Sequence, residues 1–148
     1  MPTSEEIQSQ LNYEVAVYRE QLSMLKRETE RVSLTTIDLV NALHTVENLG
    51  PEKAFMPIGG GAMIRGTVSG TNVLIPIGAE YLLDMKKENA VVELNRRIDA
   101  TKKAVERLNE EFTKIMTRLQ EVSGQLEQME GQARISERGQ ESVKEDYL

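Results

Sequence analysis

Apolar residues recur along the first third of the chain with a spacing that alternates between four and three residues. The positions of this seam are Leu11, Val15, Tyr18, Leu22, Leu25, Thr29, Val32, Thr36, Leu39, Leu43 and Val46. Nine of the eleven are apolar, and both exceptions are threonines. A seven-residue repeat held over this length is typical of a helix that supercoils against another helix.

The two ends of this first helix carry start and stop signals. Thr3 and Glu6 have the spacing of a capping box, in which each side chain accepts a hydrogen bond from the other residue's backbone amide. Gly50 can take the left-handed conformation after the last turn, and Pro51 cannot continue a helix. We therefore expect a helical segment over residues 3–50.

A second seam occupies the C-terminal part of the chain. Its members are Val91, Leu94, Ile98, Thr101, Val105, Leu108, Phe112, Ile115, Leu119, Val122, Leu126, Met129 and Ala133. Two seams of similar length predict a long antiparallel coiled-coil hairpin, with the chain termini together and a helix over residues 86–135. After the periodicity fades, we expect an acidic tail over residues 136–148 that frays.

The stretch between the seams is rich in Gly, Ile and Val, and residues 55–83 carry only two charged side chains, Arg65 and Glu80. Short apolar runs separated by glycine-containing turns predict strands over 55–58, 62–68, 73–77 and 80–83. Residues 54–84 are thus expected to form two β-hairpins, which gives an α+β protein that is mainly α.

Two small hairpins leave open strand edges and more apolar surface than a self-covered coiled coil can bury. We therefore expect hairpins of several subunits to join into a closed sheet or β-barrel platform. The residues expected at these subunit contacts are Phe55, Ile58, Met63, Ile64, Val68, Val73, Leu74, Ile75 and Ile77.

Composition narrows the classes of function. The chain has no cysteine, which excludes disulfides and thiolate zinc sites. Its net charge is −6, with both signs interleaved along the helices, and this disfavours a nucleic-acid partner. Neither a signal peptide nor an apolar run of the roughly 20 residues that a membrane span needs is present, so we expect a cytoplasmic protein without a membrane partner.

No motif indicates an enzyme, a cofactor or a metal site. Gly61 and Gly66 have P-loop spacing, but Thr67 and Val68 stand where Lys and Ser or Thr are required. His44 is the single histidine, and no second ligand type lies at metal spacing from it. The acid pairs lie on helix surfaces or in the tail, without a concave site, and no serine stands near a histidine base.

The order of a long helix, two β-hairpins and a matching long helix resembles the archaeal alpha class of the prefoldin family. The residues that carry the resemblance are Pro57-Ile58-Gly59-Gly60-Gly61, Ile64-Arg65-Gly66-Thr67-Val68, Val73-Leu74-Ile75-Pro76-Ile77-Gly78 and Tyr81. The likeness covers about residues 5–135. The chain departs from the family pattern in the extra Gly60 and in Pro76, which cannot donate to a ladder and should lie at an edge, a bulge or the end of pairing.

This resemblance implies a hexamer of two alpha and four beta subunits, with a double β-barrel platform and protruding coiled coils. It also implies an ATP-independent chaperone, without a cofactor, that captures non-native polypeptides at the coiled-coil tips and passes them to a group II chaperonin. By position, the client-contact residues would be Ile7, Leu11, Val15, Met129 and Ile135. The alternative is a structural tether or adaptor that holds two folded partners apart.

Overall fold

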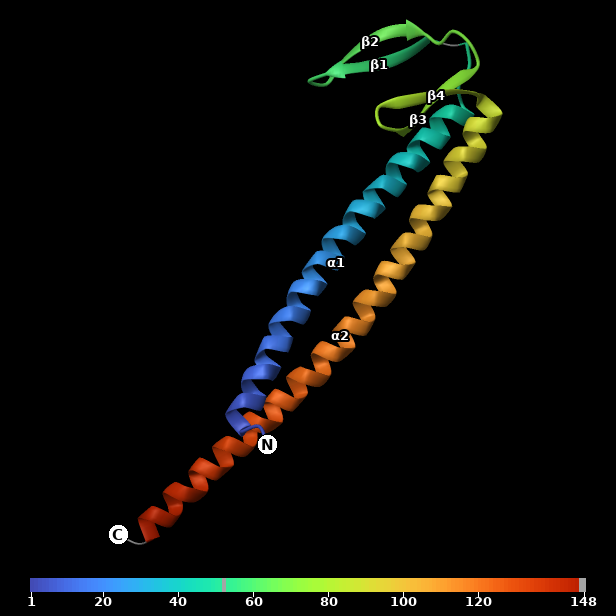
Figure 1. Cartoon of the computed structure of the whole chain (residues 1–148). Coiled ribbons are helices and arrows are strands. Elements are labelled where there is room, and N and C mark those ends of the chain that lie inside the picture. The colour runs from blue at the N-terminus through green and yellow to red at the C-terminus, as the bar shows by residue number, and fades with distance from the viewer. Residues whose placement is uncertain (52, 147–148) are drawn as a thin grey trace. The chain divides into compact units, whose positions relative to one another are not determined.

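The computed structural model describes residues 1–51 and 53–146 of the chain (Figure 1). Its elements are α1 (Ser4–Glu47), β1 (Lys53–Gly59), β2 (Ala62–Thr67), β3 (Asn72–Gly78), β4 (Tyr81–Lys86) and α2 (Lys87–Asp146). The predicted α+β class, with two long helices on either side of two β-hairpins, is confirmed. The chain divides into two compact units, one of Arg31–Val105 and one of Met1–Glu30 with the chain from Glu106 onward.

The first helix begins at the predicted capping box. The backbone amide of Thr3 donates to Oε2 of Glu6 at 2.8 Å, and the amide of Glu6 donates to Oγ1 of Thr3 at 3.2 Å. Two of the backbone donors near the helix start are thereby satisfied by side chains.

The end of α1 differs from the expectation, because the helix stops at Glu47 and Gly50 does not have a positive φ. The ammonium of Lys87, the first residue of α2, instead donates to the carbonyl oxygens of Glu47 (3.2 Å) and Leu49 (3.4 Å). A cation that satisfies the last carbonyls of a helix and faces the negative end of its dipole removes the need for a left-handed cap.

The core of the unit Arg31–Val105 joins the second hairpin to the helices. Val46 of α1, Ile75 of β3, and Ala90 and Leu94 of α2 form one buried cluster. The partly buried residues that pack against it are Leu39, Ala42, Leu43, Leu49, Val73, Met85 and Val91. Hairpin 2 (β3–β4) is therefore anchored on the paired ends of α1 and α2 (Figure 1).

Each hairpin closes through a two-residue turn in which both residues have positive φ. Gly60 and Gly61 have φ of 56° and 80°, and Ala79 and Glu80 have φ of 48° and 64°. This is the sign of φ that a type I′ turn requires. The fourth strand accordingly begins at Tyr81 rather than at Glu80, and it runs on to Lys86.

Hairpin 1 (β1–β2) and hairpin 2 have the same register, position by position. The pair Pro57↔Met63 of hairpin 1 corresponds to Pro76↔Leu82 of hairpin 2, with every number raised by 19. The register shifts between Pro57 and Gly59, and again between Pro76 and Gly78. Pro76 thus lies at a bulge, one of the places expected for a proline that cannot donate to the ladder.

The other unit is built around a second stretch of the helical seam. Val15 of α1 is buried together with Val122 and Leu126 of α2, and Leu11, Tyr18 and Leu119 pack against them. The segments of α1 and α2 in this unit run in opposite directions, as the two seams predict (Figure 1). Among the described helices, none is long and apolar enough to cross a membrane.

The expectation of a second helix over 86–135 and a frayed tail is corrected by the structure, in which α2 continues to Asp146. Every residue from 132 to 146 is exposed, so this extension has no covering element among the described residues. Opposite charges three residues apart, as in Arg134 and Glu137 or Arg138 and Glu141, favour helix without a packed face. The last two residues of the expected tail, 147–148, lie outside the described residues.

Candidate functional site

Direct cross-strand pairing puts two different surfaces on each hairpin, since paired residues point to the same side of a sheet. Face A contains Ala54, Met56, Ile64 and Gly66 in hairpin 1, and Val73, Ile75, Leu83 and Met85 in hairpin 2. Face B contains Lys53, Phe55, Pro57, Met63, Arg65 and Thr67 in hairpin 1, and Asn72, Leu74, Pro76, Leu82, Asp84 and Lys86 in hairpin 2.

Face B is uncovered on both hairpins. Its large apolar side chains, Phe55, Met63, Leu74 and Leu82, are between 56% and 64% exposed. Contiguous exposed apolar surface of this kind marks interaction sites on proteins. The guanidinium of Arg65 lies over the ring of its cross-strand partner Phe55, 5.6 Å from the ring centroid, which is within cation–π range.

Face A differs between the two hairpins although the backbones correspond. In hairpin 2, Ile75 is only 4% exposed because it inserts into the core with the helices. The corresponding residue of hairpin 1, Met56, is 46% exposed, and its Cε occupies the space that a Cβ on Gly66 would fill. The first hairpin therefore presents both of its faces, whereas hairpin 2 presents face B and only part of face A, where Leu83 is 47% exposed.

The structure sorts the nine residues predicted for subunit assembly into three groups. Six are exposed: Phe55, Ile58, Met63, Ile64, Leu74 and Ile77. Val68 and Val73 are half-buried, and Ile75 belongs to the core of its own chain. Of these nine, the six exposed residues can meet another subunit without rearrangement.

Four exposed apolar residues of the hairpins were missed by the sequence reasoning: Met56, Tyr81, Leu82 and Leu83. The sequence does contain a pattern that could have identified them, because the tripeptide Pro-Ile-Gly occurs twice, beginning at Pro57 and at Pro76. Aligning these two segments would have placed Leu82 opposite Met63 and Leu83 opposite Ile64, as the register now does.

The five residues predicted for client contact all belong to the unit that contains the chain ends. Ile7 is 41% and Ile135 is 72% exposed. Leu11 and Met129 are half-buried, and Val15 is buried in the helical seam. Ile7 and Leu11 line a shallow groove of about 250 Å³ together with Pro2, Glu6, Gln10 and Glu14.

Val143, on the extension of α2, is a further exposed apolar residue of this unit that was not predicted for client contact. The seam alternation continues from Ala133 through Ser136 and Gln140 to Val143. Counting the spacing through those two polar positions would have found it.

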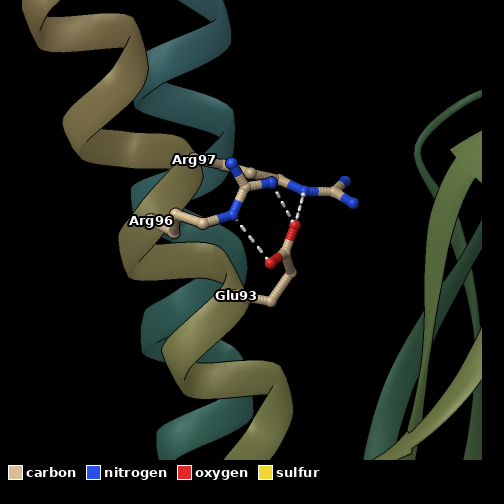
Figure 2. A network of polar contacts seen from close by, with 3 residues as sticks. All are labelled: Glu93, Arg96 and Arg97. Carbon is tan, nitrogen blue, oxygen red and sulfur yellow. Dashed lines mark hydrogen bonds and ion pairs between the residues drawn. The ribbon is translucent and has the colours of Figure 1, made fainter.

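Three charged side chains, Glu93, Arg96 and Arg97, form a cluster on the surface of α2 near its first turns (Figure 2). Glu93 Oε1 accepts from Nη2 of Arg96 (2.7 Å) and from Nε of Arg97 (2.8 Å), and its Oε2 accepts from Nε of Arg96 (2.9 Å). The hydrogen bonds from Arg96 and then from Arg97 lower the pKa of Glu93 to about 2, and Glu93 raises the pKa of Arg96. The cluster consists of two ion pairs that share Glu93 and order side chains on one helix.

In the described part of the chain, no three His, Cys, Asp or Glu residues are grouped so that they could hold a metal ion. His44 lies near the end of α1, where its backbone carbonyl accepts a hydrogen bond from the side-chain amide of Asn48 at 2.8 Å. The exposed apolar side chains of the candidate site lie on the hairpins and near the chain ends.

Comparison with known proteins relates the chain to one protein family. The family model for the prefoldin subunit matches residues 18–132. The chain is 30% identical to prefoldin subunit alpha of Methanococcus aeolicus, over 87% of this chain and 93% of that one. It is also 30% identical to prefoldin subunit alpha of Methanospirillum hungatei, over 91% of this chain and 89% of that one.

Two solved structures have similar folds. One is the filamentous prefoldin of Methanocaldococcus jannaschii, with a TM-score of 0.66 and 19% identity, covering 77% of this chain and 98% of that chain. The other is the prefoldin beta subunit of a Thermococcus strain, with a TM-score of 0.56 and 19% identity, covering 86% of this chain and 92% of that chain. At this identity, the likeness concerns the fold.

Proposed function

Because this chain belongs to the prefoldin family, whose members are chaperone subunits and not enzymes, we propose that it is an ATP-independent holdase subunit. In this proposal it captures non-native polypeptides in the cytoplasm and passes them to a group II chaperonin. Its assembly partners are beta-class subunits, in a hexamer of two alpha and four beta chains.

The observation that carries this proposal is the large apolar surface that the hairpins leave uncovered. Face B is exposed on both hairpins, and each small sheet has open edges. A lone two-stranded sheet with an apolar face is unstable in water and prone to aggregation. Pairing with hairpins of other subunits would cover these faces and edges, and it would gather several coiled coils into one particle.

The exposed apolar residues near the chain ends supply weak client contacts. Ile7, Ile135 and Val143 are exposed on helices, and the groove beside Ile7 is shallow. A single contact of this kind binds weakly. When several coiled coils of one particle hold the same unfolded chain, each further contact is intramolecular, and the overall affinity for that chain rises. No nucleotide is required for such binding.

The test is suppression of aggregation of a chemically denatured client by the complex with a beta-class subunit, without nucleotide. Replacing Ile7, Ile135 and Val143 together by serine should weaken suppression severalfold while the mass of the complex is unchanged. Val92→Ser is the matched control, since Val92 is 69% exposed but lies in the other unit, outside the proposed client surface. Full activity of the triple variant would refute the client surface.

A tether between folded partners predicts a different result in the same preparation. Such a protein would retain folded partners in fixed stoichiometry and would leave aggregation of the denatured client unchanged. The handover step needs a separate measurement, in which labelled client moves from the complex to a group II chaperonin. Release only into free solution would remove the chaperonin from the proposal.

A further inference from the structure

The two hairpins carry opposite charges at corresponding positions of face B. In hairpin 1, the middle pair of this face is Phe55↔Arg65, and in hairpin 2 it is Leu74↔Asp84. Both pairs thus combine one exposed apolar residue with one charged residue, on backbones that correspond position by position. Any contact that centres one face B on another must bury the charge at its middle.

Both charged groups are available for a partner. Arg65 and Asp84 are exposed, and neither forms an ion pair with another residue in the described ranges. Stacking on Phe55 holds the guanidinium of Arg65 over the apolar surface without neutralising it. Burial of either charge without an opposite charge would be strongly unfavourable, so a packed face B needs the complementary group.

The signs of the charges select between the possible contacts. Packing hairpin 1 on hairpin 1 of another copy would bury two Arg65 guanidiniums in one interface, and packing hairpin 2 on hairpin 2 would bury two Asp84 carboxylates. Like charges brought together at an interface are repulsive and act against the wrong arrangement. Packing hairpin 1 on hairpin 2 is the arrangement in which both charges are neutralised.

We propose that Arg65 of one copy of this chain pairs with Asp84 of a second copy, with face B of hairpin 1 packed on face B of hairpin 2. A two-fold axis then produces the same contact twice, because each copy supplies one Arg65 and one Asp84. This inference deepens the proposed function, since it names the partner of the hairpins and the residues that set their pairing.

The experiment uses two differently tagged copies of the full chain, produced alone and together with a beta-class subunit. Tandem capture and native mass spectrometry then count the particles that hold both tags. Arg65→Glu in both copies, or Asp84→Lys in both copies, should lower the number of such particles about tenfold or more through like-charge contacts. Lys53→Glu, at the end pair of the same face, is the matched control and should change the count little.

The decisive sample combines one copy that carries Arg65→Glu with one that carries Asp84→Lys. Both contacts of the pair then have opposite charges again, so particles with one of each tag should return to the wild-type level. A chain with both reversals should likewise pair with itself, which separates a charge effect from misfolding of one variant.

Three results would overturn the inference: wild-type copies that never occur together in either setting, single reversals that pair like wild type, or a mixture that is not restored. Suppression of client aggregation is measured on the same samples. If the wild-type complex suppresses aggregation while the reversals leave pairing intact, the proposed function stands and the Arg65–Asp84 contact is wrong. If pairing follows the charges but no sample suppresses aggregation, the contact stands and the holdase proposal fails.

Discussion

The hydroxyl oxygen of Thr36 on α1 lies 2.8 Å from that of Thr101 on α2, which makes a polar layer within an otherwise apolar seam. Each hydroxyl also lies within hydrogen-bond distance of a carbonyl oxygen of its own helix, Thr36 of Val32 (3.0 Å) and Thr101 of Ile98 (2.8 Å). A polar pair at one level of a coiled coil favours the register in which its two members meet.

Replacing one member of this pair should cost more than replacing both. Thr101→Val leaves the Thr36 hydroxyl facing a methyl group across the seam, with the Val32 carbonyl 3.0 Å away still able to accept from it, and we expect a loss of about 1 kcal/mol in the free energy of unfolding. The double change Thr36→Val with Thr101→Val should be nearly neutral, because no polar group is then left without its partner. Urea unfolding of all four proteins at one protein concentration measures the coupling, and strictly additive losses would contradict it.

Corresponding positions of the two hairpins should respond differently to truncation. Ile75→Ala opens a hole in the core with Val46 and Leu94 and should destabilise the chain by roughly 2–4 kcal/mol. Met56→Ala, the matched change in hairpin 1, should cost far less, because Met56 is 46% exposed. Thermal unfolding of the two variants compares them, and equal losses would mean that face A of hairpin 1 is also buried in the isolated chain.

Substitutions in the two hairpin turns can test the energetic cost of a positive φ separately from changes in side-chain packing. Ala79 has φ of 48°, so Ala79→Gly should stabilise the chain by up to about 1 kcal/mol. Gly60→Ala should destabilise it by a similar amount, although a Cβ there would meet no atom within 4 Å. Gly139→Ala, in open space on α2, is the control with the opposite sign, since alanine favours helix by about 1 kcal/mol. The urea unfolding midpoints of the three variants, each compared with the wild type, measure these changes in stability. A midpoint for Ala79→Gly below that of the wild type would contradict the prediction.

The ammonium of Lys87 should stabilise the end of α1. Lys87→Met keeps most of the apolar stem but removes the donors to the carbonyls of Glu47 and Leu49, and we expect a loss of about 1–2 kcal/mol. Lys86→Met is the control, because Lys86 is exposed at the end of β4. Hydrogen exchange of the last turn of α1 should quicken in the Lys87 variant alone.

Acid should weaken the two ion pairs of Glu93 on α2 in a defined pH range. The pKa of Glu93 is lowered from 4.5 to about 2 by its hydrogen bonds to Arg96 and Arg97. A lowered pKa stabilises the folded state fully above the unfolded value, near pH 4.5, and this contribution is lost as the pH falls through about 2. The stability difference between the wild type and Glu93→Gln should therefore shrink over that range.

Urea midpoints of the two proteins at several pH values between 7 and 2 measure this difference. Glu110→Gln serves as a control for the loss of one exposed carboxylate from the same helix. A difference between wild type and Glu93→Gln that stays constant down to pH 2 would contradict the lowered pKa.

The helices and hairpins could be predicted because their signals are local. Seam periodicity located both helices, and glycines at the turns located the hairpins, with Pro76 at a bulge as expected. The length of α2 could not be read from the seam, because its extension is held by helix propensity and charge spacing rather than by packing. The cap at the end of α1 depends on Lys87, which is 40 residues away from Glu47 in the sequence. No local sequence pattern predicts this contact.

The exposure of the candidate site residues was harder to predict, since the apolar pattern does not reveal which face finds a partner within the chain. Ile75 and Met56 occupy the same place in the hairpin register, yet only Ile75 reaches the helices. Val15 has the character expected of a client contact, but it faces Val122 across the seam. In both cases long-range packing decides exposure.

The shared register of the hairpins also has a genetic consequence. A deletion of 19 residues that removes β1, β2 and the link to β3 would leave α1, one complete hairpin and α2 in their original order. The remaining hairpin would be the one whose Ile75 anchors it to the helices. A single in-frame deletion or duplication of this unit therefore converts between a chain that contributes four strands and one that contributes two.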